Sequence, residues 1–411
     1  MSSGWNKFKL IDAIQFNPKE IIKKGDVVKK VAMEKLEPFN RKISGYEEVA
    51  FTSGTKFRNG DTLLARITPC LENGKTAQVD ILDKDEVGFG STEYIVLREK
   101  LGVTDNDFIY YLSISPEFRN VAIKAMNGSS GRQRVQKDVL ENSEFTLPPL
   151  YEQKAIAKVL SDLDEKIETN NKINRTLEEM AQAIFKQWFV DFEFPNEEGK
   201  PYKSSGGEMV ESELGMIPKG WDSKSLLDIA DYLNGLAMQK FRPEDYEKGI
   251  PVLKIKELRQ GKIDENSDVC SLNIDRKYII HDGDVIFSWS GSLLVDFWCG
   301  GKCGLNQHLF KVTSSRFEKW FYYLWTKYHL DKFIRIAKDK ATTMGHIKRA
   351  DLSNSIVLVP NEEIMNKVNL ILNPIIEKII EARIEERKLS ELRDTLLPKL
   401  MSGEIRVQLN N

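Results

Sequence analysis

The sequence of 411 residues lacks the features that mark membrane, secreted and metal-binding proteins. It contains no run of about 18 apolar residues, and its first residues, Met1 to Trp5, do not form the apolar centre of a signal peptide. Its four cysteines are too few for a disulfide framework, and no second cysteine pair or histidine pair follows Cys299 and Cys303 at zinc spacing. We therefore expect a cytoplasmic protein with no membrane segment and no metal site.

Sequence patterns of nucleotide-dependent and nucleic-acid-modifying enzymes are also missing. The chain has no Gly-x-x-x-x-Gly-Lys-Ser/Thr phosphate loop and no Pro-Asp step that could begin the common nuclease pattern. Residues 147–150 (Leu-Pro-Pro-Leu) lack the acid or amide and the aromatic residue with which adenine methyltransferases hold a flipped base, so we interpret them as a helix boundary. These absences favour a binding protein with no catalytic residues and no cofactor of its own. A fused methyltransferase or nuclease with an unrecognised active site is the alternative.

An internal repeat with an offset of 212 residues is the clearest positive feature of the chain. The segment from Ile156 to Ile167 returns as Val368 to Ile379, and the register holds without a gap for about sixty residues. A period this long indicates two copies of a whole domain with its connecting helix, since solenoid repeats run at about 20–50 residues. Two similar halves can fold about an internal two-fold axis and present two similar surfaces. A gene duplication without functional symmetry is the alternative.

A long helix is predicted after the globular part of each copy. Between Pro149 and Phe192, apolar residues recur at alternating steps of four and three, which is the pattern of a coiled-coil seam, and the second copy repeats it. About forty residues at 1.5 Å each give a helix of ~60 Å. The two helices are expected to pair with each other. Two separate amphipathic helices, each lying on its own domain, are the alternative.

Each seam has a polar middle, which we expect to fix the register of the pairing. These positions are Asn170 and Asn174 in the first seam and Ala382 and Glu386 in the second. An antiparallel pairing brings the two polar middles together. Pro374 predicts a kink or a broken first turn in the second helix.

Each globular half mixes β-rich runs with helical segments. The predicted fold class is therefore α+β, with two mixed α/β domains joined by two long antiparallel coiled-coil helices in a pseudo-two-fold arrangement. Strands are predicted at 62–67 and 94–97 in the first half and at 285–289 and 308–312 in the second, and helices around 107–126 and 317–338.

Each half also contains a loop of small residues beside a basic cluster, at 127–134 and 338–349. The net charge of −2 means that any affinity for nucleic acid must come from such local patches. Positive side chains mixed with Ser, Thr, Gln and Asn suit phosphate contacts together with base-edge hydrogen bonds, although a solvated surface without a ligand is the alternative. The candidate DNA-binding residues are Arg66, Lys75, Arg132, Gln133 and Arg134 in the first half, and in the second Lys338, Lys340 and Lys348 for phosphates and Thr342, Thr343 and His346 for base edges.

Several strings resemble the specificity subunit of type I restriction–modification systems. Residues 212–221 (Ser-Glu-Leu-Gly-Met-Ile-Pro-Lys-Gly-Trp) resemble the start of that family's target-recognition domains. Residues 188–195 and 392–403 resemble the ends of its two conserved helices, and the Leu-Pro-Pro-Leu-Tyr-Glu-Gln-Lys start at 147 also fits. The resemblance covers nearly the whole chain in the family's order. It implies a first target-recognition domain (1–149), a central conserved helical spacer (150–194), a linker (195–219), a second target-recognition domain (220–360) and a distal conserved helical region (361–411).

The resemblance also implies a function. Each target-recognition domain of such a subunit reads one half of a split double-stranded DNA target, and the helices set the spacing between the halves. The subunit holds two modification subunits, which carry S-adenosylmethionine chemistry, while separate restriction subunits carry translocation and cleavage that depend on ATP and Mg. A coiled-coil adaptor without a role on DNA is the remaining alternative.

Overall fold

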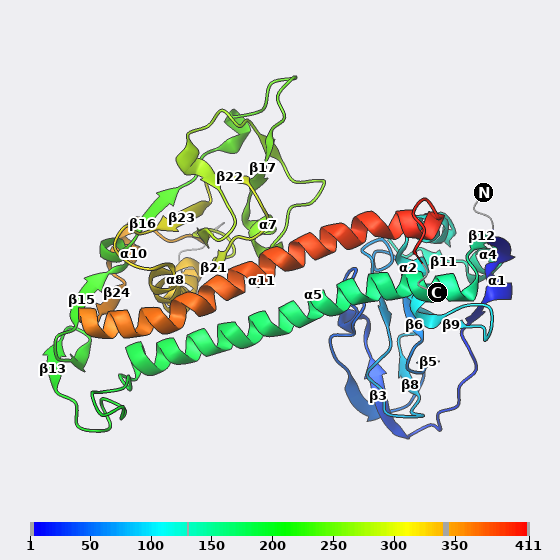
Figure 1. The fold of residues 1–411 in the computed structure, drawn as a ribbon, viewed down its shortest axis with the longest axis horizontal. Coiled ribbons are helices and arrows are strands. Elements are labelled where there is room, and N and C mark those ends of the chain that lie inside the picture. Colours follow the sequence, from blue (N-terminus) through cyan, green and yellow to red (C-terminus); the bar gives the residue numbers. More distant parts are fainter. Residues whose placement is uncertain (1–3, 130, 340–344, 409–411) are drawn as a thin grey trace. The chain divides into compact units, whose positions relative to one another are not determined.

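The structure is a computed structural model that describes residues 4–129, 131–339 and 345–408. The chain divides into two compact units, of which unit 1 contains Met1–Lys166 with Leu389–Asn411 and unit 2 contains Ile167–Lys388 (Figure 1). Each unit combines a globular domain with one section of each long helix. Among the described helices, none has both the length and the apolar character needed to cross a bilayer.

Unit 1 contains two four-stranded sheets. One has the strand order β2-β9-β6-β7, the other has the order β4-β3-β8-β5, and β1 pairs with β12. The strands are β1 (Asn6–Lys9), β2 (Ile14–Phe16), β3 (Val27–Val31), β4 (Glu47–Ala50), β5 (Thr55–Phe57), β6 (Thr62–Ala65), β7 (Thr76–Gln78), β8 (Gly88–Gly90), β9 (Tyr94–Glu99), β10 (Met126–Asn127), β11 (Arg134–Val135) and β12 (Glu144–Leu147). The helices are α1 (Leu10–Ala13), α2 (Asn106–Ile114), α3 (Pro116–Lys124), α4 (Lys137–Asn142) and the start of α5 (Leu150–Phe185).

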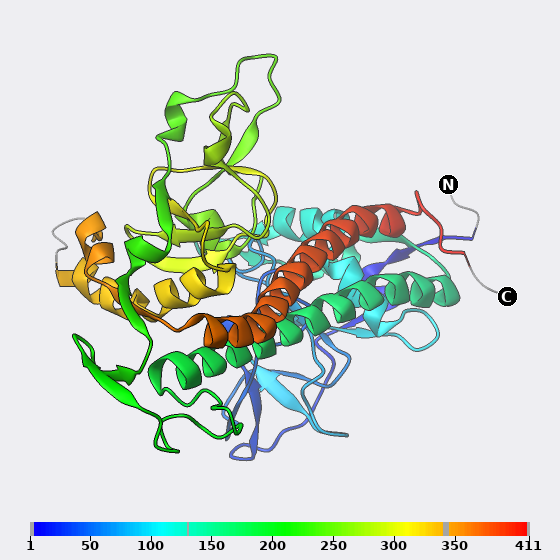
Figure 2. The ribbon, with the colours of Figure 1, turned by 60° about the vertical axis from the view of Figure 1, so that its left-hand side comes forward.

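Unit 2, drawn mainly in green, yellow and orange in Figure 2, repeats this topology. Its two sheets have the orders β16-β23-β20-β21 and β18-β17-β22-β19, and β15 pairs with β24. The strands are β13 (Met209–Ser212), β14 (Gly215–Pro218), β15 (Asp222–Ser225), β16 (Asp231–Asn234), β17 (Ile250–Leu253), β18 (Val269–Cys270), β19 (Ile279–Ile280), β20 (Val285–Ser288), β21 (Leu294–Phe297), β22 (Cys303–Leu305), β23 (Leu309–Thr313) and β24 (Ile356–Val359). The helices are α6 (Leu226–Ile229), α7 (Ile255–Gln260), α8 (Lys319–Tyr328), α9 (Leu330–Asp339), α10 (Arg349–Ser353) and α11 (Glu362–Ser402), whose end lies in unit 1.

The two domains also match in strand direction. The only parallel pairs among the described strands are β3 with β8 and β17 with β22, and they occupy the same place in the strand order of their sheets. The predicted strands at 62–67, 94–97, 285–289 and 308–312 are confirmed as β6, β9, β20 and β23. The expectation of a repeated, mixed α/β domain is therefore confirmed.

The turn that leads into the central strand is built alike in both domains. Asp61, before β6, accepts hydrogen bonds from the backbone N–H of Arg58 at 2.7 Å and from the guanidinium of Arg98 at 2.6 and 2.7 Å. Asp284, before β20, accepts from the backbone N–H of His281 at 2.9 Å and pairs with the Lys311 amine at 2.8 Å. The carboxylate thus closes a turn and receives a cation from the neighbouring strand in each case.

The helix predicted around 107–126 is two helices, α2 and α3. The break falls at Ser115, whose hydroxyl accepts a hydrogen bond from the backbone N–H of Phe118 at 3.3 Å and caps α3. Pro116 then occupies the first turn of α3, where its missing N–H costs nothing. The helix predicted around 317–338 is likewise divided, at His329, into α8 and α9.

In unit 1, the start of α5 lies beside the end of α11. Ile156 and Leu160 share one apolar core with Leu397 and Leu400. Asp164 on α5 receives a hydrogen bond from Arg393 on α11 at 2.8 Å. In the first turn of α5, the buried Glu152 carboxylate accepts hydrogen bonds from Trp5 Nε1 at 3.1 Å and from Arg406 at 2.5 and 2.8 Å. The first and last described segments of the chain therefore meet at this carboxylate.

In unit 2, the rest of α5 lies beside the first part of α11. Ala181 and Phe185 belong to the same apolar core as Val368 and Leu372. The N–H of the Asn170 side chain donates to Glu385 at 2.8 Å, within the polar middle that the sequence predicts. All the apolar seam positions named in the two helices are buried or half-buried.

Pro374 does not break the first turn of α11, because that helix begins at Glu362 and continues through the proline to Ser402. A proline removes the hydrogen bond to the carbonyl four residues earlier, here that of Leu370. Leu370 is 80% exposed, so water can reach this part of the helix surface. The expectation of a broken first turn was therefore wrong.

The segment 195–219, expected to be a linker, is organised. Met209–Ser212 and Gly215–Pro218 form the antiparallel hairpin of β13 and β14. Ile217 on β14 is buried in the apolar core of unit 2. The composition of the segment indicated exposure correctly for most of its residues, but it gave no sign that one strand residue anchors the hairpin to the domain.

His329, between α8 and α9, should make unit 2 sensitive to acid. Its ring is 9% exposed, Nε2 donates to the carbonyl of Ile356 at 2.8 Å, and burial lowers its pKa to about 4. The unfolded chain binds the proton at its ordinary pKa of about 6.5, so stability from the neutral ring is present above that value and is lost as the pH falls towards 4. The expected loss between pH 7 and 4.5 is about 2–3 kcal/mol.

Denaturant unfolding at these two pH values tests this expectation. His329→Gln should remove about 2–3 kcal/mol from the difference between the two free energies of unfolding. His281→Gln, which alters an exposed histidine, should leave the difference unchanged. An identical pH dependence in wild type and His329→Gln would show that His329 does not carry the effect.

Candidate nucleic-acid interface

In unit 1, the loop 127–134 lies along the segment that follows β6. The backbone N–H of Thr68 donates to the carbonyl of Gln133 at 3.0 Å, and that of Val135 donates to the carbonyl of Arg66 at 2.8 Å. These bonds bring three of the predicted DNA-binding residues together, namely Arg66, Gln133 and Arg134. Residues nearly seventy positions apart in the sequence thus form one polar surface at the end of the sheet.

The two arginines of this surface already bind other groups of unit 1. The Arg134 guanidinium donates to the Glu93 carboxylate through Nε and Nη2 at 2.7–3.0 Å. Arg66 donates from Nη2 to the carbonyl of Val135 at 3.0 Å, while its Nε is buried without a hydrogen-bond partner among the described residues. Glu93 did not emerge from the sequence, because acidic residues carry no signal for DNA binding on their own.

The other two predicted residues of this half, Arg132 and Lys75, differ in their exposure to solvent. Arg132 is exposed in the turn of the loop. The amine of Lys75 instead donates to the carbonyl of Met33 at 2.9 Å. Lys75 is therefore half-buried and ties two loops together.

Arg119, which the sequence did not indicate, lies close to the loops that contain Phe39 and Glu72. The guanidinium of Arg119, on α3, lies 4.9 Å from the ring centre of Phe39 and donates to the carbonyl of Glu72 at 3.1 Å. Burial lowers the pKa of Arg119. Phe39 has a positive φ of 56°, an unusual conformation for a bulky side chain, and Gly74 leaves room for its ring. Only the three-dimensional arrangement reveals this platform.

In unit 2, Lys338 at the end of α9 and Lys348 before α10 are exposed, as phosphate-binding residues must be. His346 is also exposed and forms an isolated β-bridge with Ser290, while its ring lies 6.3 Å from that of Trp289. Three further predicted residues, Lys340, Thr342 and Thr343, lie outside the described residues.

His346 belongs to an aromatic and polar group that the sequence did not indicate. Trp289 is half-buried, its ring centre lies 6.0 Å from that of His308, and its Nε1 donates to Asn234 at 2.9 Å. Ser290 Oγ lies 3.0 Å from His308 Nδ1. Strand prediction placed Trp289 and His308 in β-structure but could not show that β20, β23 and the loop 345–347 meet at one end of the sheet.

The polar middle of the seam is buried as well. Asn170 and Asn174 are 2% and 6% exposed, and Ala382 is 3% exposed. Asn174 Oδ1 has no hydrogen-bond partner among the described residues. Burial raises the pKa of the half-buried Glu386, against the opposing effects of Arg383 and a hydrogen bond from Asn171.

Two arginines of α11 attach this helix to the domain of unit 2. Arg383 donates to Glu178 on α5 at 2.6 Å and to Asp296 on β21 at 2.8 Å. Arg387 donates to Asp282 at 2.7 Å, in the turn before β20. Through these paired charges α11 therefore contacts both α5 and the sheet that contains β20 and β21.

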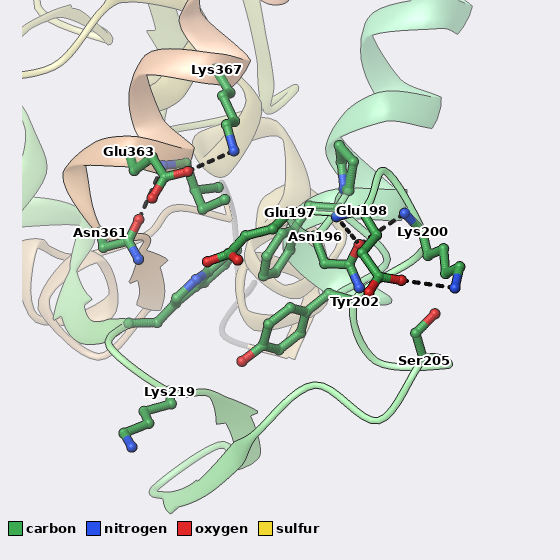
Figure 3. Close-up of a pocket in the computed structure, with 14 residues that line it drawn as sticks. Asn196, Glu197, Glu198, Lys200, Tyr202, Ser205, Lys219, Asn361, Glu363 and Lys367 are labelled. Carbon is green, nitrogen blue, oxygen red and sulfur yellow. Dashed lines mark hydrogen bonds and ion pairs between the residues drawn. The ribbon is translucent and has the colours of Figure 1, made fainter.

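Figure 3 shows a pocket of about 470 Å³ in unit 2, between the segment after α5 and the start of α11. Part of its wall is aromatic, where the ring of Phe194 stacks at 4.5 Å from that of Tyr202 and at 5.3 Å from that of Trp221. Its lysines are paired with carboxylates, as in the ion pairs Lys200–Glu198 at 2.8 Å and Lys367–Glu363 at 2.7 Å. This pocket does not offer the concentrated positive charge that a phosphate backbone requires. Within the described ranges no group of three or more His, Cys, Asp or Glu is arranged to hold a metal ion.

Comparison with known proteins places both halves in one family. The family described as "Type I restriction modification DNA specificity domain" matches residues 2–179 and 218–391. The MjaIX type I restriction enzyme specificity subunit of Methanocaldococcus jannaschii is 31% identical over 314 residues, which cover 74% of this chain and 70% of that protein. The HindI specificity subunit of Haemophilus influenzae is 24% identical over 420 residues, covering 88% and 90%.

A solved structure is similar in fold. The S subunit of a type I restriction–modification system from M. genitalium matches with a TM-score of 0.58 at 16% sequence identity, over 97% of this chain and 96% of that one. At this identity the likeness concerns the fold alone.

Proposed function

This chain belongs to the family of type I restriction–modification DNA specificity proteins, and from that membership we propose that it is the non-catalytic subunit that selects the DNA sequence for such a complex. The observation that carries the proposal is the occurrence of the family's domain twice in one chain, in two units of equal strand order. Each domain reads one half of a split target. Duplicated domains with unlike surface residues suit two half-sites of different sequence.

We infer that α5 and α11 form one antiparallel coiled coil that acts as the spacer, with the halves of the chain related by a pseudo-two-fold axis. The burial of Asn170, Asn174 and Ala382 and the half-burial of Glu386 support their role in fixing the register, since a polar seam position disfavours shifted pairings. A rod of ~60 Å fits a span of about one to two turns of duplex, at 34–36 Å per turn.

The binding loops divide into two kinds of contact. Lys338, Lys348 and Arg132 are exposed cations and suit phosphates, as does the predicted Lys340. Thr342, Thr343 and His346 are proposed to face base edges in the second half, as are Gln133 and Arg134 in the first, next to Arg66. Lys75 is proposed to support the loop, since its amine already binds the carbonyl of Met33.

The partners supply the chemistry. The chain holds two modification subunits, which use S-adenosylmethionine, and the cytoplasmic complex recruits restriction subunits that use ATP and Mg. Delegated chemistry explains why the chain carries no recognised catalytic motif. The net charge of −2 gives the isolated chain no long-range attraction to DNA, so we expect tight binding only with modification subunits present.

Methyl transfer to DNA tests this function directly. The purified chain alone should transfer no methyl group, and the chain with two modification subunits should methylate adenines in one split sequence. Turnover by the chain alone, after a control for contaminating methyltransferase, would support the fused-enzyme alternative. Methylation without sequence preference, or no DNA binding in the full complex, would support the adaptor alternative.

A further inference from the structure

The two units place different side chains at three equivalent positions of the fold. Ile67, just after β6, forms an isolated antiparallel bridge with Arg134, and Ser290, just after β20, forms one with His346. β6 and β20 hold the same place in the strand order of their sheets. The two bridges therefore join the same two segments of the repeated domain.

A backbone hydrogen bond repeats beside each bridge. The N–H of Val135 donates to the carbonyl of Arg66 at 2.8 Å, and the N–H of Ile347 donates to the carbonyl of Trp289 at 3.1 Å. Val135 and Ile347 are both buried, so they belong to the framework. Arg66 in unit 1 thus corresponds to Trp289 in unit 2.

The neighbouring strand supplies a third equivalent position. Ala65 pairs with Tyr94 across β6 and β9, and Ser288 pairs with Leu309 across β20 and β23. All four of these framework residues are buried. The residues immediately before the paired strands, Glu93 and His308, therefore occupy one place.

These alignments define a charged centre in unit 1, formed by Arg66, Glu93 and Arg134, and an aromatic centre in unit 2, formed by Trp289, His308 and His346. Inside the framework the residues stay apolar or small, whereas at the three centre positions the chemistry changes completely. A fold that keeps its strand pairing and places different side chains at these positions has the property required of two readers of different sequences. The positions that determine specificity are expected where the repeat diverges most within a conserved frame.

We propose that the charged centre and the aromatic centre are the base-reading centres of the two domains. This inference rests on the proposed DNA-recognition function and assigns it to particular side chains. In the charged centre, Glu93 holds the Nε and Nη2 edge of Arg134, which leaves Nη1 for a base, and a guanidinium suits the O6 and N7 acceptors of guanine. In the aromatic centre, Trp289 offers an apolar ring whose N–H is already bound by Asn234, which suits contact with a thymine methyl group.

The test uses the complex of the full chain with its modification subunits on duplexes that carry single base-pair changes in either half-site. Arg134→Gln should reduce discrimination at a G·C pair of one half-site by about 5- to 150-fold and leave the other half-site unaffected. Trp289→Ala should do the same at an A·T pair of the other half-site. Glu93→Gln should weaken discrimination at the Arg134-dependent pair, because Glu93 is a positioning residue. Trp289→Phe, which keeps an aromatic ring, should retain most of the discrimination, and normal discrimination at the other half-site by Trp289→Ala shows that its loss is not a failure to fold.

Matched controls separate base reading from backbone binding. Arg132→Ala and Lys348→Ala alter exposed cations of the same loops and should weaken all duplexes alike, with a smaller salt dependence of binding. If the wild-type complex methylates without sequence preference, the proposed function fails. If the wild type is selective and Arg134→Gln and Trp289→Ala keep its selectivity, the base-reading centres are wrong while the function stands.

Discussion

Replacement of residues 221–355 by the corresponding domain of another specificity subunit should change one half of the methylated target and leave the other half intact. The two four-stranded sheets of unit 2 and two of its apolar clusters lie wholly within this segment, so we expect it to carry its proposed reading surface as a block. Specific sites are bound at least about 1,000-fold more tightly than non-specific DNA, so affinity for the original target should fall by about that factor.

The exchanged complex is to be assayed by methylation mapping and by binding to the old and the new duplex. The control keeps the chain's own residues 221–355 and carries only the sequence changes at the two junctions. It shows whether those changes alone impair the protein. Two changed half-sites, or an unchanged target, would contradict independent reading by the two domains.

Arg383→Met should lower the free energy of unfolding by about 3–5 kcal/mol. The Arg383 guanidinium holds Glu178 and Asp296, at 2.6 and 2.8 Å, with its side chain 20% exposed. Its removal leaves two partly buried carboxylates facing each other without a cation. Denaturant unfolding of the full chain measures the loss.

A surface ion pair on the same helix is the matched control. Lys378 lies 3.3 Å from Glu381 with a side chain that is 58% exposed, so Lys378→Met should change the free energy of unfolding by less than about 1 kcal/mol. Adding Glu178→Met and Asp296→Asn to Arg383→Met should restore much of the loss, since the uncompensated charges disappear. Equal effects of Arg383→Met and Lys378→Met would show that the buried network is not what stabilises this region.

The fold followed from the sequence where periodicity is long. Seam residues such as Ile156, Leu160 and Leu372 are buried as predicted, because a pattern sustained over forty residues leaves few alternatives. Features that depend on only a few residues could not be predicted from the sequence. The break at Ser115 depends on one capping hydroxyl, and the hairpin in 195–219 is anchored through the end of one strand, where Ile217 is buried.

The candidate site was only half predictable. Arg134 and His346 emerged from the sequence because they lie in loops whose composition is unusual. Glu93, Trp289 and His308 did not, because their proximity depends on how strands pair and on where a distant loop returns. Such contacts lie dozens of residues apart in the sequence, and composition within a local window contains no information about them.

The division of the chain into units has a consequence for synthesis on the ribosome. Unit 2, Ile167–Lys388, is continuous in sequence and can close as soon as it has emerged, whereas unit 1 also needs Leu389 and the residues after it. At about 5–20 residues per second, the 222 residues of unit 2 take roughly 10–45 s to translate. During that interval Ile156 and Leu160 lack their partners on the end of α11, and Glu152 lacks Arg406. The domain made first is thus completed last, and the nascent chain presents an apolar helix face to chaperones until its final turn is made.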